Sequence, residues 1–127
     1  MKPALGLPPA ARLRRAADFA ALRNARGRFQ ARYFLLRWIE SPEATARLGL
    51  AVSRKVSKRA VQRNRIKRIA RESFREQRDG LPPFDVLVIA RSSAVTADRP
   101  ALHADLRHAW QKLKALKQAS APGTIDG

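Results

Sequence analysis

The chain of 127 residues contains no cysteine, so it forms no disulfide and no zinc site that needs thiolate ligands. It also contains no apolar run long enough to cross a membrane. Residues 1–12 hold three prolines and lack the apolar core of a signal peptide. These absences predict a soluble cytoplasmic protein with no membrane partner.

Acidic residues are scarce. The chain has 10 Asp and Glu against 27 Lys and Arg, which gives a formal net charge of +17. Such an excess repels itself, and it is tolerable where a polyanion supplies the opposite charge. Nucleic acid is the first candidate for that polyanion, and an anionic membrane surface is the second.

Groups that could catalyse a reaction are equally few. A metal-dependent nuclease needs clustered carboxylates, and acid–base hydrolysis needs a pair of suitable side chains such as histidines. The acids are scattered, and His103 and His108 point about 140° apart on an expected helix. We therefore expect no catalytic residue in this chain, no metal or cofactor bound by the protein alone, and both histidines on the surface.

Local patterns predict one RNA-binding domain over residues 13–117, between a flexible segment 1–12 and a disordered tail 118–127. Asp18 is expected to cap a short helix that carries Phe19 and Leu22 and stops at Gly27. Further elements are expected as strands at 33–39 and 47–53, a long helix at 59–78, a buried strand at 84–91, and a helix from 98. This order indicates an α+β sandwich, with helices packed on a sheet.

Alternation assigns faces to the first two of these strands. In the strand at 33–39 it separates Tyr33, Leu35 and Arg37 from the remaining large side chains, which are Phe34, Leu36 and Trp38. In the strand at 47–53 it directs Leu48, Leu50 and Val52 to the core and leaves Gly49 and Ala51 as a shallow outer surface. The loop at Pro42 between the two strands predicts a hairpin connection.

The long helix concentrates the positive charge. Residues 54–78 contain 11 basic and two acidic residues, which is +9 of the total of +17. A helical period places one stripe against the sheet, namely Ile66, Ile69, Ala70, Ser73 and Phe74. The opposite side carries Asn64, Lys67, Arg68, Arg71 and Arg75.

A solvated basic surface is the ordinary interpretation of a charged helix. Here few carboxylates are available to compensate, and like charges at i, i+4 destabilise a helix, so binding to a polyanion accounts better for the pattern. Arginine grips phosphate with a planar fork and stacks on bases, which favours RNA. Asn64 suits a ribose hydroxyl or a base edge, although it could instead cap a helical turn.

These residues resemble a known family. The segment Lys58–Arg75, with Arg63-Asn64-Arg65 at its core, is similar to the signature helix of the bacterial ribonuclease P protein component. The segment Arg47–Lys55 resembles the strand before that helix, Asp18-Phe19 its first helix, and Phe84–Arg91 its last strand. The similarity runs in the family's order over about residues 13–115.

The resemblance implies an α-β-β-β-α-β-α sandwich with a four-stranded sheet and a left-handed β-α-β crossover, the ribosomal protein S5 domain 2-type fold. That hand departs from the rule that most such crossovers obey. The additional strand would be short and lie near Arg28–Arg32.

The resemblance also implies a function in the ribonuclease P holoenzyme, an endoribonuclease that removes the 5′ leader of precursor tRNA. The catalytic RNA subunit would perform the hydrolysis with Mg²⁺ that is held mainly by RNA, and no obligate protein partner is implied. The residues that would bind the RNA subunit are Arg54, Lys55, Lys58, Arg59, Arg63, Asn64, Arg65, Lys67, Arg68, Arg71 and Arg75.

A cleft beside the sheet would hold the single-stranded leader. The matching positions are Phe19, Leu35 and Arg37, with Tyr33 close by. Phe19 fits a core position equally well. The sequence has Leu22-Arg23 where the family often has a second aromatic residue, and Arg37 where an aromatic is common. Leader contact is therefore expected to rest more on cation–phosphate attraction than on stacking.

Two alternatives belong to other classes. A structural RNA-binding or RNA-chaperone protein would share the basic helix but would not assist leader removal. A membrane-active helix would bind anionic vesicles in preference to RNA. The narrow apolar stripe argues against the membrane interpretation, because the sheet already requires that stripe.

Overall fold

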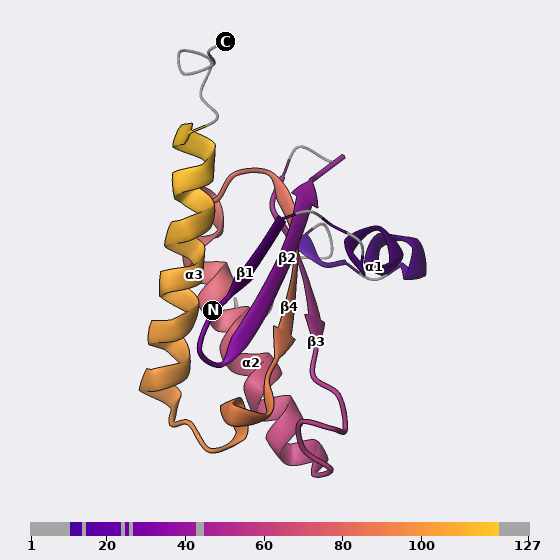
Figure 1. Cartoon of the computed structure of the whole chain (residues 1–127), viewed down its shortest axis with the longest axis vertical. Helices are drawn as coiled ribbons and strands as arrows, with labels where there is room; N and C mark the ends of the chain where they lie inside the picture. Colours follow the sequence, from indigo (N-terminus) through magenta and orange to yellow (C-terminus); the bar gives the residue numbers. More distant parts are fainter. Residues whose placement is uncertain (1–10, 14, 24, 26, 43–44, 120–127) are drawn as a thin grey trace, which may run out of the picture.

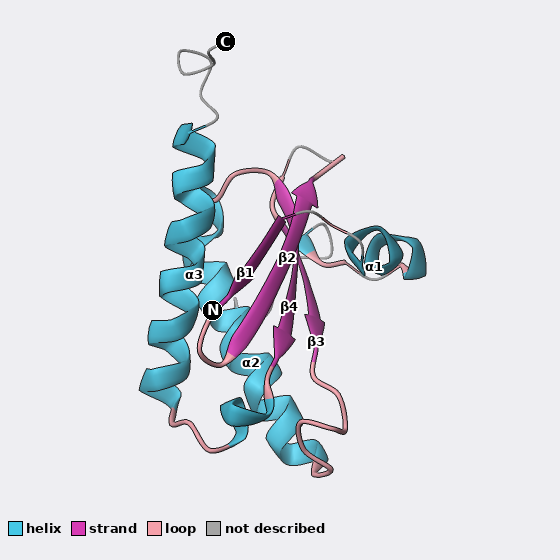
Figure 2. Ribbon diagram, in the orientation of Figure 1, coloured by secondary structure: helices cyan, strands magenta, loops and turns pink. Residues whose placement is uncertain are grey.

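The structure is a computed structural model that describes residues 11–119 except 14, 24, 26, 43 and 44. Within these residues a four-stranded sheet packs with three α-helices (Figures 1 and 2). The elements in chain order are α1 (Ala16–Arg23), β1 (Gly27–Gln30), β2 (Phe34–Glu40), β3 (Arg47–Ala51), α2 (Ala60–Gln77), β4 (Phe84–Ala90) and α3 (Arg99–Ala119). Short 3-10 turns follow α2 at Arg78–Gly80 and β4 at Ser92–Val95.

The strand order in the sheet is β1-β2-β4-β3. The pairs β1–β2 and β2–β4 are antiparallel, whereas β3–β4 is parallel and is joined through α2. The α-β-β-β-α-β-α order is thereby confirmed, and the fourth strand expected near residues 28–32 is β1. The hand of the β3–α2–β4 crossover stays a prediction.

The expected hairpin between β2 and β3 is wrong. β4 lies between these two strands, and the hairpin is formed by β1 and β2. The physical reason lies in the composition of β4, which is apolar on both faces and therefore takes a central position where both faces are covered.

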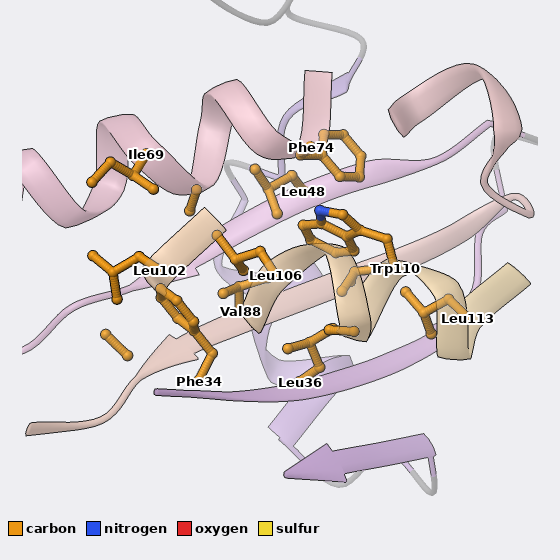
Figure 3. Packing of buried hydrophobic residues seen from close by; sticks show 14 of the residues in the cluster. Phe34, Leu36, Leu48, Ile69, Phe74, Val88, Leu102, Leu106, Trp110 and Leu113 are labelled. Atoms are coloured by element: carbon orange, nitrogen blue, oxygen red, sulfur yellow. The ribbon is translucent and has the colours of Figure 1, made fainter. Parts of the chain in front are cut away.

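One face of the sheet, here called the α2/α3 face, carries most of the core. Nineteen buried residues of the described chain form a single cluster there. Figure 3 shows Leu106 of α3 beside Val88 of the sheet, and the indole ring of Trp110 of α3 below Phe74 of α2. The predicted apolar stripe of α3 is confirmed in full, since all its members are buried: Leu102, Leu106, Ala109, Trp110 and Leu113.

The opposite face, here called the α1 face, carries a much smaller cluster. It consists of four buried residues, Leu13, Leu22, Ala25 and Leu87. In Figure 1 α1 and α3 lie on opposite sides of the sheet. The faces expected for β3 are also confirmed: Leu48 packs in the large cluster and Ala51 against the small one.

Three local expectations at the beginning of the chain require correction. Asp18 lies inside the first turn of α1, so it is not the cap. Gly27 does not stop α1, which ends at Arg23; Gly27 begins β1, where a Cβ would lie 2.4 Å from the Trp38 indole. The folded region also starts earlier than residue 13, because Ala11 is fully buried and Arg12 forms a parallel bridge with Leu48. Residues 1–10 and 120–127 lie outside the described residues.

Candidate nucleic-acid interface

The rotation of α2 about its axis is set by its buried side. The predicted stripe is confirmed, since Ile66, Ile69, Ala70, Ser73 and Phe74 are all buried. A hydrogen bond of 2.8 Å from Trp110 Nε1 to Ser73 Oγ also joins α2 to α3. Because this side is occupied, the opposite side of α2 must face outward.

The outward side carries the predicted polar and basic residues. Asn64, Arg68 and Arg75 are exposed, and Lys67 and Arg71 are half-buried. Glu72, one of the two carboxylates of the helix, is engaged by α3, where Arg99 lies 2.5 Å from its Oε1 atom. The charge of that carboxylate is therefore directed toward the helix interface, away from the outer basic residues.

Two of the predicted RNA-binding arginines also hold the fold together. Arg63 donates a hydrogen bond of 2.9 Å to the carbonyl oxygen of Ser57, and Arg65 donates one of 3.2 Å to that of Ala97. Each guanidinium group carries five N–H donors, so one such bond leaves donors for an external phosphate. The sequence pattern did not reveal this second role, because the Arg65 bond depends on a distant loop that the fold brings close, and the Arg63 bond depends on the conformation of the loop before α2.

The loop before α2 adds a second basic group. Arg54, Lys55 and Lys58 are exposed and line a surface hollow of about 490 Å³. Val61, in the first turn of α2, has an exposed fraction of 74%. The N-terminal end of α2 thus presents cations on an open surface, which is the arrangement expected for contact with a polyanion.

A further hollow, of about 260 Å³, lies at the β3 edge of the sheet between α1 and α2. It brings Lys67 and Arg71 of α2 together with Phe19 of α1. Arg12 and Leu13 complete the site and were missed by the sequence interpretation, which placed Arg12 in a flexible segment. The bridge of Arg12 to Leu48, a hydrogen bond of 2.9 Å from the Leu13 N–H to the Leu48 carbonyl oxygen, and the burial of Leu13 hold them here, and no local pattern signals these contacts.

The cations of this hollow, which we call the β3-edge hollow, repel one another. Partial burial lowers the pKa of Arg71, and the nearby charges of Arg12 and Arg68 lower it further. A phosphate placed between these groups would relieve both the repulsion and the desolvation. The β3-edge hollow therefore has the electrostatics of an anion site with an aromatic wall.

The four residues predicted for the leader cleft do not converge on one point. Phe19 lies over β3, where a Cβ on Gly49 would come within 2.9 Å of its ring, so the expected shallow surface at Gly49 is covered. Leu35 and Arg37 lie on β2 opposite Ile89 and Leu87, which belong to the α1 face. Phe19, Leu35 and Arg37 thus lie on the same face of the sheet. Phe19 lies over β3, whereas Leu35 and Arg37 belong to β2, and β4 separates these two strands.

Tyr33 is placed elsewhere. It packs against the large cluster of the α2/α3 face, and its backbone N–H donates a hydrogen bond of 2.8 Å to Asp105 of α3. The expectation that Tyr33 shares a face with Leu35 and Arg37 is therefore wrong. Tyr33 precedes the first residue of β2, and the α3 contact rather than strand alternation sets its orientation.

Arg37 has a partner within the fold and a like-charged neighbour across the hairpin. Its guanidinium group donates a hydrogen bond to the carbonyl oxygen of Arg23 at the end of α1. Its cross-strand partner is Arg28, which is exposed. Like charges directly opposite in an antiparallel pair are destabilising. An external anion on the α1 face would offset that repulsion.

The histidines differ from each other. His108 is exposed and its ring packs 5.6 Å from that of Phe29, whereas His103 is largely buried and lies 3.6 Å from Glu72. The expected surface position is therefore wrong for His103. In the part of the chain that the structure describes, no three His, Cys, Asp or Glu residues gather into a possible metal site. Within the same residues, no helix is long and apolar enough to cross a membrane.

The fold and this interface define a class: a small, basic α+β protein whose central helix exposes arginines on its outer side. The Ribonuclease P family model matches residues 7–114. The ribonuclease P protein component of Coxiella burnetii is 34% identical over 110 residues, covering 87% of this chain and 91% of that protein. The protein component of Azoarcus is 40% identical over 102 residues, covering 80% and 85%.

Solved structures agree with these relatives. The RNase P protein of Staphylococcus aureus superposes with a TM-score of 0.73 at 31% identity, covering 87% of this chain and 95% of that one. The RNase P protein of Thermotoga maritima gives a TM-score of 0.71 at 29% identity, covering 80% and 96%. The chain belongs to the ribonuclease P protein family, the protein subunit of an enzyme that processes tRNA.

Proposed function

We propose that this chain binds the catalytic RNA subunit of ribonuclease P through the outer side of α2 and the loop before it. The observation that carries the proposal is the orientation of α2, whose apolar stripe is buried while Asn64 and Arg68 are exposed. Fixed guanidinium groups on a rigid helix suit phosphates at fixed spacing along a folded RNA. The proposed contact residues are Arg54, Lys55, Lys58, Arg59, Arg63, Asn64, Arg65, Lys67, Arg68, Arg71 and Arg75.

We further propose that the 5′ leader of precursor tRNA runs along the α1 face toward the β3-edge hollow. Phe19 there offers a ring for an unpaired base, and Arg12, Lys67 and Arg71 offer charge for the adjoining phosphates. Leu35 and Arg37 would contact the leader farther along the same face. Tyr33 has no place in this path, because it packs on the α2/α3 face.

The chemical step is assigned to the RNA. Among the described residues, neither a set of metal ligands nor a pair of histidines comes together. The carboxylates that form ion pairs mostly connect one helix or strand to another. We propose that the Mg²⁺ of the holoenzyme is held mainly by RNA. The protein contributes positive charge and a fixed path for the leader. These two contributions lower the Mg²⁺ concentration at which cleavage proceeds. The absence of cysteine is compatible with this role in the cytoplasm.

The test is cleavage of precursor tRNA by ribonuclease P RNA at low Mg²⁺, with and without the protein. Added protein should accelerate leader removal, and the R68A variant should require a higher protein concentration for the same rate. R107A is the matched control, because Arg107 is an exposed arginine on α3 outside the proposed interface. A rate no higher than that of RNA alone would favour the RNA-chaperone alternative.

A further inference from the structure

Carboxylates are so scarce in this chain that their positions indicate what the fold requires. Two of the 10 acids, Asp18 and Asp85, converge on one arginine, Arg47. Arg47 and Asp85 are register partners in the parallel β3–β4 pair. Asp18 reaches the same guanidinium group from α1, which lies on the opposite face of the sheet from α2.

The guanidinium group of Arg47 binds Asp85 through two hydrogen bonds and also lies close to Asp18. Its Nε and NH2 atoms donate to the two carboxylate oxygens of Asp85 at 2.8 Å and 2.7 Å. The NH2 atom also lies 3.6 Å from Oδ1 of Asp18. The Asp85 side chain is 3% exposed and that of Arg47 is 12% exposed, so water screens this group weakly. Arg47 thereby joins the first turn of α1 to two strands of the sheet.

The other end of α1 is held from a different strand. Arg37 of β2 donates a hydrogen bond to the carbonyl oxygen of Arg23, the last residue of the helix. A cation at that position satisfies one of the carbonyls that a helix end leaves unpaired, and it interacts favourably with the helix dipole. The eight-residue α1 is therefore fastened at its first turn from β3 and at its last residue from β2.

This attachment matters because the apolar cluster beneath α1 is small. The cluster on its face contains four buried residues, of which Leu22 is the one that α1 contributes. Phe19 follows Asp18 directly in the sequence and forms the α1 wall of the β3-edge hollow. A shift of the first turn would move that ring relative to Arg71 on α2.

We propose that Asp18, Arg47 and Arg37 are positioning residues that fasten α1 across the sheet and so set the width of the β3-edge hollow for the leader. The proposal rests on the proposed function of that hollow. It assigns to Arg37 a role in holding α1, in addition to any contact with the leader. Asp85 has the separate role of holding Arg47 in the sheet.

The primary variant is D18N in the reconstituted holoenzyme, with affinity measured for precursor tRNA and for leaderless tRNA. The ratio of the two dissociation constants isolates the leader contribution. D18N should reduce that contribution about threefold, as expected for the loss of one partly buried ion pair. Affinity for the RNA subunit should not fall. Simple electrostatics predicts the opposite sign, because D18N makes the protein more positive.

Three controls separate positioning from general effects. D79N makes the same charge change at an exposed residue away from α1 and should retain the wild-type ratio. D18E should recover leader discrimination. The double variant A17D/D18N keeps an acid in the first turn of α1 at an exposed site but removes it from Arg47, so it should behave as D18N does. Recovery in A17D/D18N would attribute the effect to the helix dipole and overturn the proposal.

A structural measurement completes the test. The chain has no cysteine, so spin labels can be placed at Ala20→Cys on α1 and Gln30→Cys on β1. The distance distribution between the labels should broaden in D18N and in R37Q, and it should stay narrow in D79N. If D18N does not fold, R37Q tests the other attachment. If the variants keep wild-type leader discrimination and a narrow distribution of label distances, the proposal that these residues fasten α1 is overturned. A wild-type holoenzyme without leader discrimination would instead contradict the proposed function.

Discussion

The two faces of the sheet differ in how they are held and in what they leave open. The α2/α3 face buries 19 residues in one cluster, and both helices that cover it are joined by side-chain bonds. The α1 face buries four and relies on arginine contacts at the two ends of a short helix. Stability is thus concentrated on one face, and the other keeps a cationic hollow at its edge for a ligand.

The largest expected effect tests this difference directly with one substitution made on both faces. Leu106 and Leu22 are both fully buried. L106A should cost about 4 kcal/mol and L22A about 2 kcal/mol, because the small cluster can collapse around the missing atoms and the large one cannot. Denaturant unfolding of the two variants measures the free energies. Equal losses would mean that the two faces contribute alike to the fold.

A polar contact inside the α2/α3 face should come next. Ser73 Oγ accepts a hydrogen bond of 2.8 Å from the indole N–H of the buried Trp110, so S73A removes this partner of the N–H. The expected cost is about 2 kcal/mol. S53A, at an exposed serine before α2, serves as the control and should have little effect. A stability change below 0.5 kcal/mol in S73A would show that the α2–α3 contact is not tightly constrained.

A smaller effect is expected at Arg65, which serves both the fold and the proposed interface. Its hydrogen bond to the Ala97 carbonyl is partly exposed, so R65A should lower the free energy of unfolding by about 1 kcal/mol. It should also weaken binding to the RNA subunit. Thermal unfolding and RNA titration of the same preparation measure the two losses. Weaker RNA binding with wild-type stability would show that Arg65 binds RNA but does not stabilise the fold.

The smallest effect on stability is expected at Arg68. This residue is exposed, so R68A should change the free energy of unfolding by less than about 0.5 kcal/mol. It should nevertheless reduce the slope of log affinity against log salt by about one, since each neutralised phosphate contributes roughly that amount. RNA titrations at several salt concentrations give the slope. An unchanged slope would place Arg68 outside the contact with RNA.

The sequence was informative wherever a local period decides burial. The helical period identified every buried residue of α2 and the buried stripe of α3, and the continuous apolar run identified β4 as central. Strand pairing failed because it is not local. β2 and β3 are close in sequence, yet β4 lies between them, because β4 is apolar on both faces and is buried in the centre of the sheet.

The candidate site divides in the same way. The basic side of α2 could be predicted because charge and period occur in one segment. Arg12 could not, because it reaches the β3-edge hollow through a bridge to Leu48, a residue far from it in the sequence. Tyr33 and His103 were misplaced for a related reason: contacts with α3 and with Glu72 set their surroundings.

The amino-acid sequence alone determined the excess of positive charge, the segment 54–78 that carries +9 of the total of +17, and the apolar stripe that turns the basic side of its helix outward. These follow from composition and from the 3.6-residue period, which act within one segment. The tertiary structure alone decided the strand order, the convergence of Asp18 and Asp85 on Arg47, and the hollow between α1 and α2. Each of these joins residues far apart in the chain, and such contacts depend on how the sheet is completed.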